Sequence, residues 1–233
     1  MILNEQVWVL IPAFNESSNI EKVLGELAVF NFGGIIVVDD GSTDSTSVLA
    51  SSMGATVLRH PINQGVGAAL RTGLSYAKSF ELDWILQVDG DGQHSVGSIR
   101  EMLTHSTADL TIGTRDWKNY QFGLTRSAAQ KLLIFTLRLN GVRGVNDPTS
   151  GFRLYGKKAI NFYSETMPPN FIGDTVEALI LGAKVGLRIE SQVVQMAPRH
   201  SGDSSHDGLR IARAFIAAFL YAISYTTKRG KSC

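Results

Sequence analysis

The sequence predicts an α/β protein in which a mostly parallel sheet is flanked by helices. Short apolar runs rich in β-branched residues alternate along the chain with segments whose apolar residues recur at helical spacing. Polar clusters directly follow three of these runs, as binding loops do at the carboxyl ends of parallel strands. With 233 residues, 44% of them hydrophobic, the chain can form a domain with a sizeable core.

The first elements alternate in the order strand, helix, strand, helix. Residues 7–11 are an apolar run closed by Pro12, which predicts a buried strand. Four apolar residues then recur at helical spacing and predict a helix: Ile20, Val23, Leu24 and Leu27. Residues 35–38 predict a second buried strand, and residues 42–52 a second helix.

The alternation continues into the middle of the chain. Residues 55–58 predict a third strand, residues 65–78 a helix that begins on glycine, and residues 84–88 a fourth strand. Residues 116–126 lack periodicity and predict a loop, as does the polar segment 198–208.

Composition excludes several classes of protein. The formal net charge of +1 provides no field that would recruit nucleic acid. Cys233 is the single cysteine, which rules out a disulfide framework within the chain and favours a reducing compartment. No basic stretch followed by an apolar run opens the sequence, so a cleaved signal peptide is not expected.

A final amphipathic helix is predicted from Leu209 to Thr227, and it divides the chain into a domain of residues 1–208 and a C-terminal segment of residues 209–233. Its uncharged stretch of residues 214–227 is shorter than the ~20 residues that span a bilayer. Flanking arginines and lysines favour a helix lying in the membrane interface. The alternative is a helix packed on the domain or on a partner subunit.

Asp89-Gly90-Asp91 directly follows the predicted strand 84–88. Two carboxylates spaced in this way can hold Mg²⁺ or Mn²⁺ against a diphosphate, with Gln93 and His94 as further ligands. The other interpretation is an Asp-Gly turn.

The cluster of residues 39–44 is either a turn that caps the next helix or a site where the second carboxylate, Asp40, accepts hydrogen bonds from a nucleobase or ribose. The glycine-rich residues 63–69 lack the full Gly-x-Gly-x-x-Gly spacing and do not follow the first strand. A nicotinamide cofactor is therefore not expected.

Taken together, four motifs resemble family 2 glycosyltransferases of the GT-A fold. They are Ile11-Pro12-Ala13-Phe14-Asn15-Glu16, Val38-Asp39-Asp40-Gly41-Ser42-Thr43-Asp44, Asn63-Gln64-Gly65-Val66-Gly67 and Asp89-Gly90-Asp91-Gly92-Gln93-His94. Two later motifs are similar to the dolichyl- and polyprenyl-phosphate sugar synthase branch: Gly113-Thr114-Arg115 and Asp147-Pro148-Thr149-Ser150-Gly151-Phe152-Arg153-Leu154-Tyr155.

The resemblance implies a Rossmann-like sheet and a role for each matching residue. The positions that match the nucleotide-binding residues are Pro12, Phe14, Glu16, Val38, Asp40, Asp89 and Gly90. Those that match the metal site are Asp89, Asp91 and Gln93. Arg115 and Arg199 match arginines that meet phosphates, and Ser205 stands where the branch commonly has a lysine. With Asp91, these arginines are the expected catalytic residues.

The expected reaction is metal-dependent, inverting transfer of a hexose from a UDP- or GDP-hexose to a lipid-linked phosphate. A phosphate acceptor needs no base, whereas a hydroxyl acceptor does. Asp174 is a candidate base, although it and Glu177 also fit a helix N-terminus. The resemblance implies a peripheral enzyme on the cytoplasmic face of the membrane, with a membrane partner subunit as a further possibility.

Three alternatives to this reaction are considered from the sequence, and two of them are disfavoured. One is a glycosyltransferase with a saccharide hydroxyl acceptor in surface-polysaccharide assembly. A nucleotidyltransferase is disfavoured, because residues 12–16 are not a glycine- and lysine-rich phosphate loop. A non-catalytic nucleotide-binding module is disfavoured by the intact pair of Asp89 and Asp91.

Overall fold

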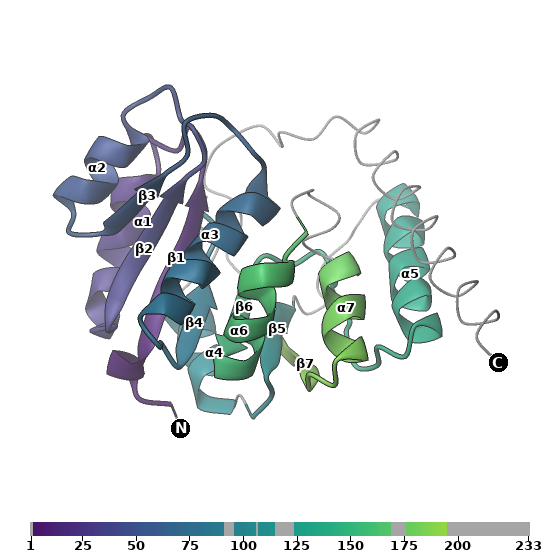
Figure 1. The fold of residues 1–233 in the computed structure, drawn as a ribbon. Coiled ribbons are helices and arrows are strands. Elements are labelled where there is room, and N and C mark those ends of the chain that lie inside the picture. The colour runs from purple at the N-terminus through teal and green to yellow at the C-terminus, as the bar shows by residue number, and fades with distance from the viewer. Residues whose placement is uncertain (1, 91–95, 106, 115–123, 169–175, 195–233) are drawn as a thin grey trace.

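In the computed structural model, the described residues are 2–90, 96–105, 107–114, 124–168 and 176–194. They form one sheet with helices on both faces (Figure 1). The strands are β1 (Val7–Ala13), β2 (Gly34–Asp39), β3 (Thr56–Arg59), β4 (Trp84–Gln87), β5 (Leu110–Thr114), β6 (Arg153–Gly156) and β7 (Ile189–Val193). The helices are α1 (Ile20–Leu27), α2 (Thr46–Ser52), α3 (Val66–Ser79), α4 (Val96–His105), α5 (Leu124–Leu139), α6 (Lys157–Thr166) and α7 (Ala178–Lys184), with 3-10 turns η1 (Asn4–Gln6) and η2 (Ala28–Phe30).

The strands lie in the order β3-β2-β1-β4-β6-β5-β7. β1 pairs in parallel with β2 and β4, β2 pairs in parallel with β3, and β5 pairs in parallel with β7. The predicted α/β class and mostly parallel sheet are therefore confirmed. β6 is the exception, because it runs antiparallel to both of its neighbours, β4 and β5. This reversal was not predicted, and it brings the residues before β6 to the edge where β4 ends.

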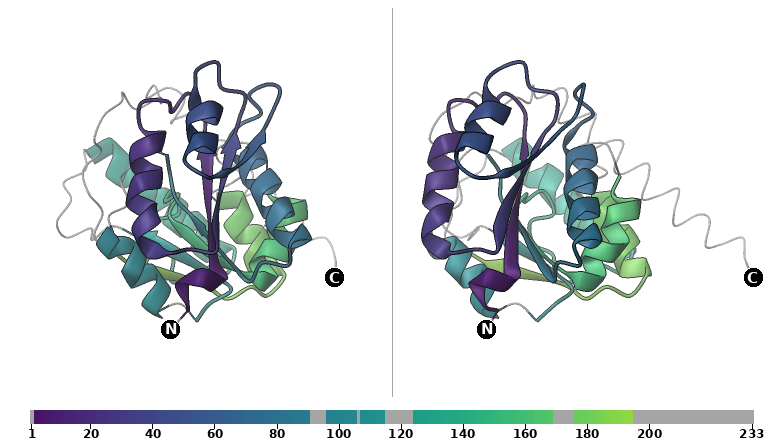
Figure 2. Two further views of the ribbon diagram at one scale, coloured as in Figure 1. Left: turned by 90° about the vertical axis from the view of Figure 1, so that its left-hand side faces the viewer. Right: turned by 60° about the vertical axis from the view of Figure 1, so that its left-hand side comes forward.

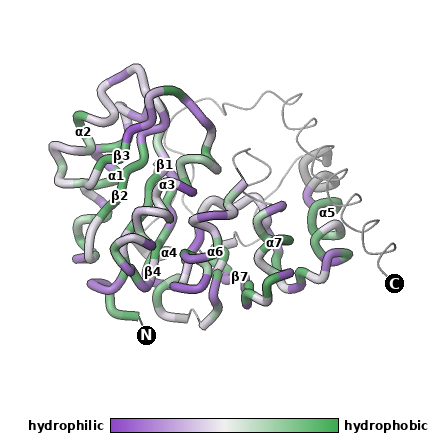
Figure 3. Tube along the Cα trace, in the orientation of Figure 1, coloured by the Kyte–Doolittle hydropathy of each residue, from purple (hydrophilic) through white to green (hydrophobic). Residues whose placement is uncertain are grey.

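Two hydrophobic cores hold the helices against the sheet. Successive side chains of a strand point to opposite faces, so Leu10 of β1 packs on one side while Val9 and Ile11 pack on the other. The first core contains buried residues of α3, α5, α6 and α7, and the second those of α1, α2 and α4. Figure 2 shows the sheet between these two layers, and Figure 3 shows the hydrophobic stretches along its strands.

The predicted elements of the first half are present, with shifted ends. β1 continues past Pro12, where the missing N–H is tolerated because the pairing of β1 with β4 ends at Leu10. α2 begins at Thr46 rather than at Ser42, since the residues between them bond to a neighbouring loop.

The prediction of a loop over residues 116–126 is wrong at its C-terminal end, because α5 begins at Leu124. Leu133 and Leu137 pack in the first core and stabilise that helix. The residues of its first turn show no helical repeat of apolar residues, so the sequence did not indicate where it begins. The predicted loop 198–208 and the predicted helix 209–227 lie outside the described residues. Within the described part of the chain, no helix is both long and apolar enough to cross a bilayer.

Candidate active site

Several loops meet at one edge of the sheet because β1, β2, β3 and β4 run parallel and end there. The antiparallel β6 adds the segment that precedes it, residues 147–152. Ligands of such sheets bind beyond the carboxyl ends of the strands. The described parts of the polar clusters predicted to share an edge therefore do so in space: residues 12–16, 39–44 and 89–90.

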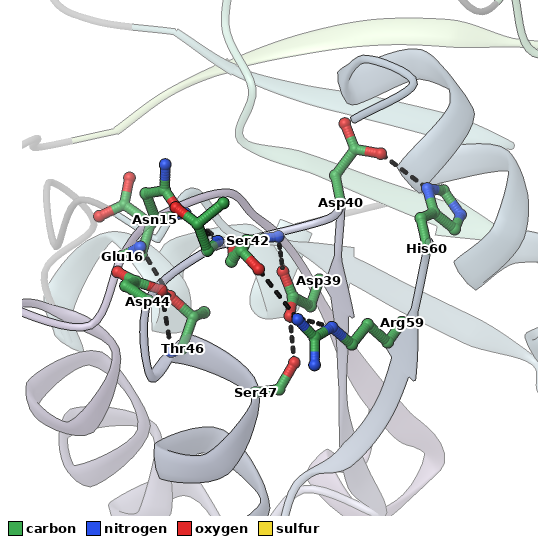
Figure 4. Close-up of polar contacts among 11 residues, drawn as sticks. Asn15, Glu16, Asp39, Asp40, Ser42, Asp44, Thr46, Ser47, Arg59 and His60 are labelled. Atoms are coloured by element: carbon green, nitrogen blue, oxygen red, sulfur yellow. Dashed lines mark hydrogen bonds and ion pairs between the residues drawn. The ribbon is translucent and has the colours of Figure 1, made fainter. Parts of the chain in front are cut away.

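Hydrogen bonds join the loop after β1 to the loop after β2 (Figure 4). Asn15 donates its backbone N–H to Ser42 Oγ at 2.9 Å, and its Oδ1 accepts the backbone N–H of Thr43 at 2.9 Å. The backbone N–H of Glu16 donates to Thr46 Oγ1 at 2.9 Å. Asn15 has φ of 55°, a conformation that asparagine adopts more readily than most residues. The two motifs thus form one double loop.

Asp39 is fully buried beneath this double loop. Its carboxylate accepts the backbone N–H of Ser42 at 2.9 Å and the hydroxyl of Ser47, and lies 3.4 Å from Arg59 Nε (Figure 4). Burial raises the pKa of Asp39, but these hydrogen bonds and the Arg59 guanidinium outweigh it, so the pKa lies below its usual value. Asp39 is therefore a structural anion.

Asp44 joins the start of α2 to the loop after β1. Its Oδ1 accepts the backbone N–H of Thr46 at 3.0 Å, and its Oδ2 accepts that of Ser17 at 3.1 Å. Burial raises the pKa of Asp44, but the hydrogen bonds from Thr46 and Ser17 outweigh it and lower the pKa to about 2. Asp44 is thus ionised at neutral pH and stabilises the double loop.

Asp40 ties the loop after β3 to the same edge. Its Oδ1 lies 2.6 Å from His60 Nδ1 and accepts the backbone N–H of Gln64 at 2.9 Å, while Oδ2 accepts that of Gly65 at 2.7 Å. His60 Nε2 lies 2.9 Å from Thr72 Oγ1. A carboxylate offers about four acceptor positions, so these three donors leave Oδ2 able to accept a hydrogen bond from a ligand.

Gly41 allows the loop after β3 to pack directly on the loop after β2. Its φ is 77°, which glycine adopts without steric cost. A Cβ at this position would lie 2.5 Å from the backbone carbonyl carbon of Ile62 and 2.6 Å from the backbone nitrogen of Asn63. The glycine of the motif is therefore required by both backbone conformation and close approach.

Asp89 follows β4 and is partly buried beside two other loops. A Cβ on Gly90 would lie 3.4 Å from Glu16 Cγ, and a Cβ on Gly151 would lie 2.4 Å from Asp89 Oδ1. The loops after β1 and β4 and the segment before β6 thus meet at one cluster. Its carboxylate oxygens are donors that suit Mg²⁺ or Mn²⁺. The described residues contain no group of three or more His, Cys, Asp or Glu that could hold a metal.

The remaining predicted residues fall into three groups. Phe14 is 45% exposed at the site edge, whereas Pro12 is partly buried in β1. Val38 is fully buried in the first core, where its side chain supports the loop that follows β2. The others lie outside the described residues: Asp91, Gln93, Arg115, Asp174 and Arg199.

Three residues of this edge were missed by the sequence analysis: His60, Thr72 and Gly151. His60 had a usable signal, because it lies two residues after the third predicted strand, where polar clusters follow the other strands. Thr72 had none, since its role depends on the packing of α3. Gly151 lies within the motif of residues 147–155, but its place beside Asp89 depends on the direction of β6.

Comparison with known proteins assigns the fold and family. Residues 8–163 match the family described as Glycosyl transferase family 2. The chain is 32% identical over 197 residues to an uncharacterized protein of Methanocaldococcus jannaschii, covering 81% of this chain and 80% of that protein. It is 29% identical over 208 residues to the UDP-N-acetylglucosamine–dolichyl-phosphate N-acetylglucosaminyltransferase of Methanococcus voltae, covering 78% and 82%.

Among solved structures, the chain is similar to glucosyl-3-phosphoglycerate synthase from Mycobacterium tuberculosis. The complex of that enzyme with UDP superposes with a TM-score of 0.70 at 24% identity, covering 93% of this chain and 79% of that one. Its complex with Mg²⁺ and UDP superposes with a TM-score of 0.69 at 22% identity. At this level of identity the likeness establishes the GT-A fold.

Fold and family together define an enzyme of the nucleotide-sugar-dependent glycosyltransferases. The chain belongs to glycosyltransferase family 2. The non-catalytic binding module and the nucleotidyltransferase are thereby set aside.

Proposed function

We propose that this enzyme transfers a hexose from a UDP- or GDP-hexose to a polyprenyl or dolichyl phosphate, with inversion and with Mg²⁺ or Mn²⁺. The observation that carries the proposal is the meeting of Glu16, Asp40 and Asp89 at one sheet edge. Relatives named as dolichyl-phosphate sugar transferases and as a polyprenol monophosphomannose synthase support the acceptor class.

On the donor side, Asp40 and Phe14 would bind the nucleoside. Asp40 is held by three protein donors, so its orientation is set before a ligand arrives. The exposed ring of Phe14 offers an apolar surface for a base or ribose.

At the diphosphate, Asp89 would hold the cation with Asp91 and Gln93. A bound cation neutralises charge that develops on the leaving nucleotide. Arg115 and Arg199 would add hydrogen bonds to phosphates of donor and acceptor. For a hydroxyl acceptor, Asp174 would act as base.

A membrane-bound acceptor requires contact with the bilayer, and α5 supports such contact. Leu132, Phe135 and Leu139 are exposed apolar residues spaced by three and four along α5, with exposed Lys131 and Arg138 beside them. An apolar stripe with a basic flank is typical of an interfacial helix. Together with the basic C-terminal segment, it favours a peripheral enzyme on the cytoplasmic face.

The alternative is a saccharide hydroxyl acceptor in surface-polysaccharide assembly. Ser205, which replaces the usual lysine of the lipid-phosphate branch, favours it. Under this alternative Asp174 gains a role as base.

The deciding experiment incubates the enzyme with a panel of UDP- and GDP-hexoses, with and without a polyprenyl phosphate, in Mn²⁺ or excess chelator. Metal-dependent formation of a polyprenyl-phosphate hexose is expected. Transfer to saccharides alone would replace the lipid acceptor by the alternative. Donor turnover unaffected by chelator would remove the metal from the proposal.

A further inference from the structure

The antiparallel direction of β6 sets Gly151 opposite Asp89. Gln87 at the end of β4 pairs with Arg153 at the start of β6. Because the strands run in opposite directions, two residues beyond Gln87 and two residues before Arg153 lie across from each other. Gly151 therefore lies beside the carboxylate proposed to bind metal, and we call the segment of residues 147–151 that ends on it the floor.

Position 151 has no room for a side chain beside that carboxylate. A Cβ built on Gly151 would lie 2.4 Å from Asp89 Oδ1, 2.6 Å from Oδ2 and 2.8 Å from Cγ, which are its three nearest atoms. Its φ is outside the left-handed region, so the backbone itself would accept other residues. Glycine is needed here because the Asp89 carboxylate occupies the space of a side chain.

Arg153, whose side chain is almost fully buried, holds the floor segment in place. Its Nε donates to the carbonyl oxygen of Ser150 at 3.0 Å, and a terminal nitrogen donates to that of Pro148 at 3.1 Å. Asp147 Oδ1 accepts the hydroxyl of Thr149 at 2.8 Å. Because these bonds hold the backbone of the segment, it cannot easily move away from a larger side chain at residue 151.

We propose that Gly151 is a positioning residue for the metal site, with Arg153 as its anchor. The flat backbone face of Gly151 limits the rotation of the Asp89 carboxylate and holds it in the orientation that binds the cation. This inference rests on the metal role of Asp89 in the proposed function. Neighbours that orient a ligand typically change metal affinity 10–100-fold when altered.

The test measures Mn²⁺ binding to the full-length protein by calorimetry and by electron paramagnetic resonance, alone and with UDP or GDP. Gly151→Ala is expected to weaken Mn²⁺ binding about 10–100-fold and to reduce the mutual strengthening of Mn²⁺ and nucleotide binding. Nucleotide affinity without metal should fall less than Mn²⁺ affinity, because the added Cβ would displace Asp89 while the hydrogen bonds that hold Asp40 come from the loop after β3.

Gly156→Ala is the matched control at the other end of β6. Its added Cβ would lie 3.1 Å from the ring of Trp84, so it crowds the same strand without touching Asp89. Gly156→Ala should lower the melting temperature without changing Mn²⁺ affinity. This control therefore distinguishes an effect of lower stability from an effect of altered metal-site geometry.

Equal Mn²⁺ affinity in wild type and a folded Gly151→Ala protein would overturn the inference. If Gly151→Ala does not fold, Arg153→Lys takes its place, because lysine keeps the charge but not the two-carbonyl geometry of the guanidinium. Unchanged Mn²⁺ affinity in that variant would overturn the inference as well. Failure of the wild type to bind Mn²⁺ would instead contradict the proposed function.

Discussion

Asp40 holds a loop of the fold in place and keeps capacity for the ligand contact proposed above. Its carboxylate accepts three hydrogen bonds from the loop after β3 and keeps capacity for one more. Asp39, next to it, instead contacts Ser42 of the double loop, Ser47 of α2 and Arg59 of β3. Adjacent carboxylates therefore have different roles because alternate strand residues face different loops.

Asp40→Asn should weaken UDP or GDP binding more than it slows transfer. The amide places an NH₂ donor against the N–H donors of His60, Gln64 or Gly65, and an unsatisfied pair costs about 1–3 kcal/mol. The proposed nucleoside contact exists before and after transfer, so its loss raises KM more than it lowers kcat. Titration calorimetry measures affinity, and Asp44→Asn controls for loop destabilisation. Unchanged nucleotide affinity in Asp40→Asn would remove Asp40 from the site.

Asp89→Asn should lower turnover by orders of magnitude while the circular dichroism spectrum and melting temperature stay close to those of wild type. The lost negative charge acts on the cation, whose effect is greatest as charge develops on the leaving diphosphate. Steady-state assays across Mn²⁺ concentrations check this. The metal role of Asp89 would be wrong if the variant kept wild-type turnover at low Mn²⁺.

At the scale of elements, periodicity was enough to predict β1 to β4 and the helices between them. β1, β2 and β4 are buried in a parallel sheet, so their apolar runs are continuous and visible in sequence, whereas β3 is a partly exposed edge strand. β6 is different: it carries the buried Arg153 and is only four residues long, so nothing in its sequence shows direction or burial. The candidate site was predictable where loops follow parallel strands. The position of Gly151 opposite Asp89 was not predictable, because it depends on the antiparallel direction of β6.

The double loop should weaken in acid through Asp44, which bonds Ser17 to the start of α2. Its pKa is lowered from 3.8 to about 2, so its stabilisation is complete above the unfolded value and is lost as pH falls through that interval. Asp44→Asn should reduce the free energy of unfolding at neutral pH by up to about 1 kcal/mol, since the site is exposed.

Urea unfolding of both proteins between about pH 7 and about pH 2 checks this linkage. The difference between wild type and Asp44→Asn should shrink toward the acid end of that range. A difference that stays constant with pH would show that Asp44 stabilises the loop without its charge.

For the whole molecule, position on the membrane decides whether a lipid-linked acceptor can reach the site. The exposed stripe of Leu132, Phe135 and Leu139 on α5 and the basic C-terminal segment are the two features that favour membrane contact. Each basic residue near an anionic surface contributes about 1 kcal/mol, which salt screens. The apolar contribution of Phe135 is independent of salt, so the two features can be separated.

Flotation with anionic liposomes should therefore recover the full-length enzyme, and high salt should release part of it. Truncation after Gly208 should release nearly all of it, while Phe135→Glu should weaken the salt-resistant fraction. The truncated enzyme should still bind nucleotide, because the donor residues precede the cut, yet lose activity on a polyprenyl phosphate. If the full-length protein stays unbound beside anionic liposomes, the C-terminal segment is a packing element or a subunit contact. A saccharide acceptor then becomes the better-supported hypothesis for this enzyme, because Ser205 already replaces the lysine that is common in the lipid-phosphate branch.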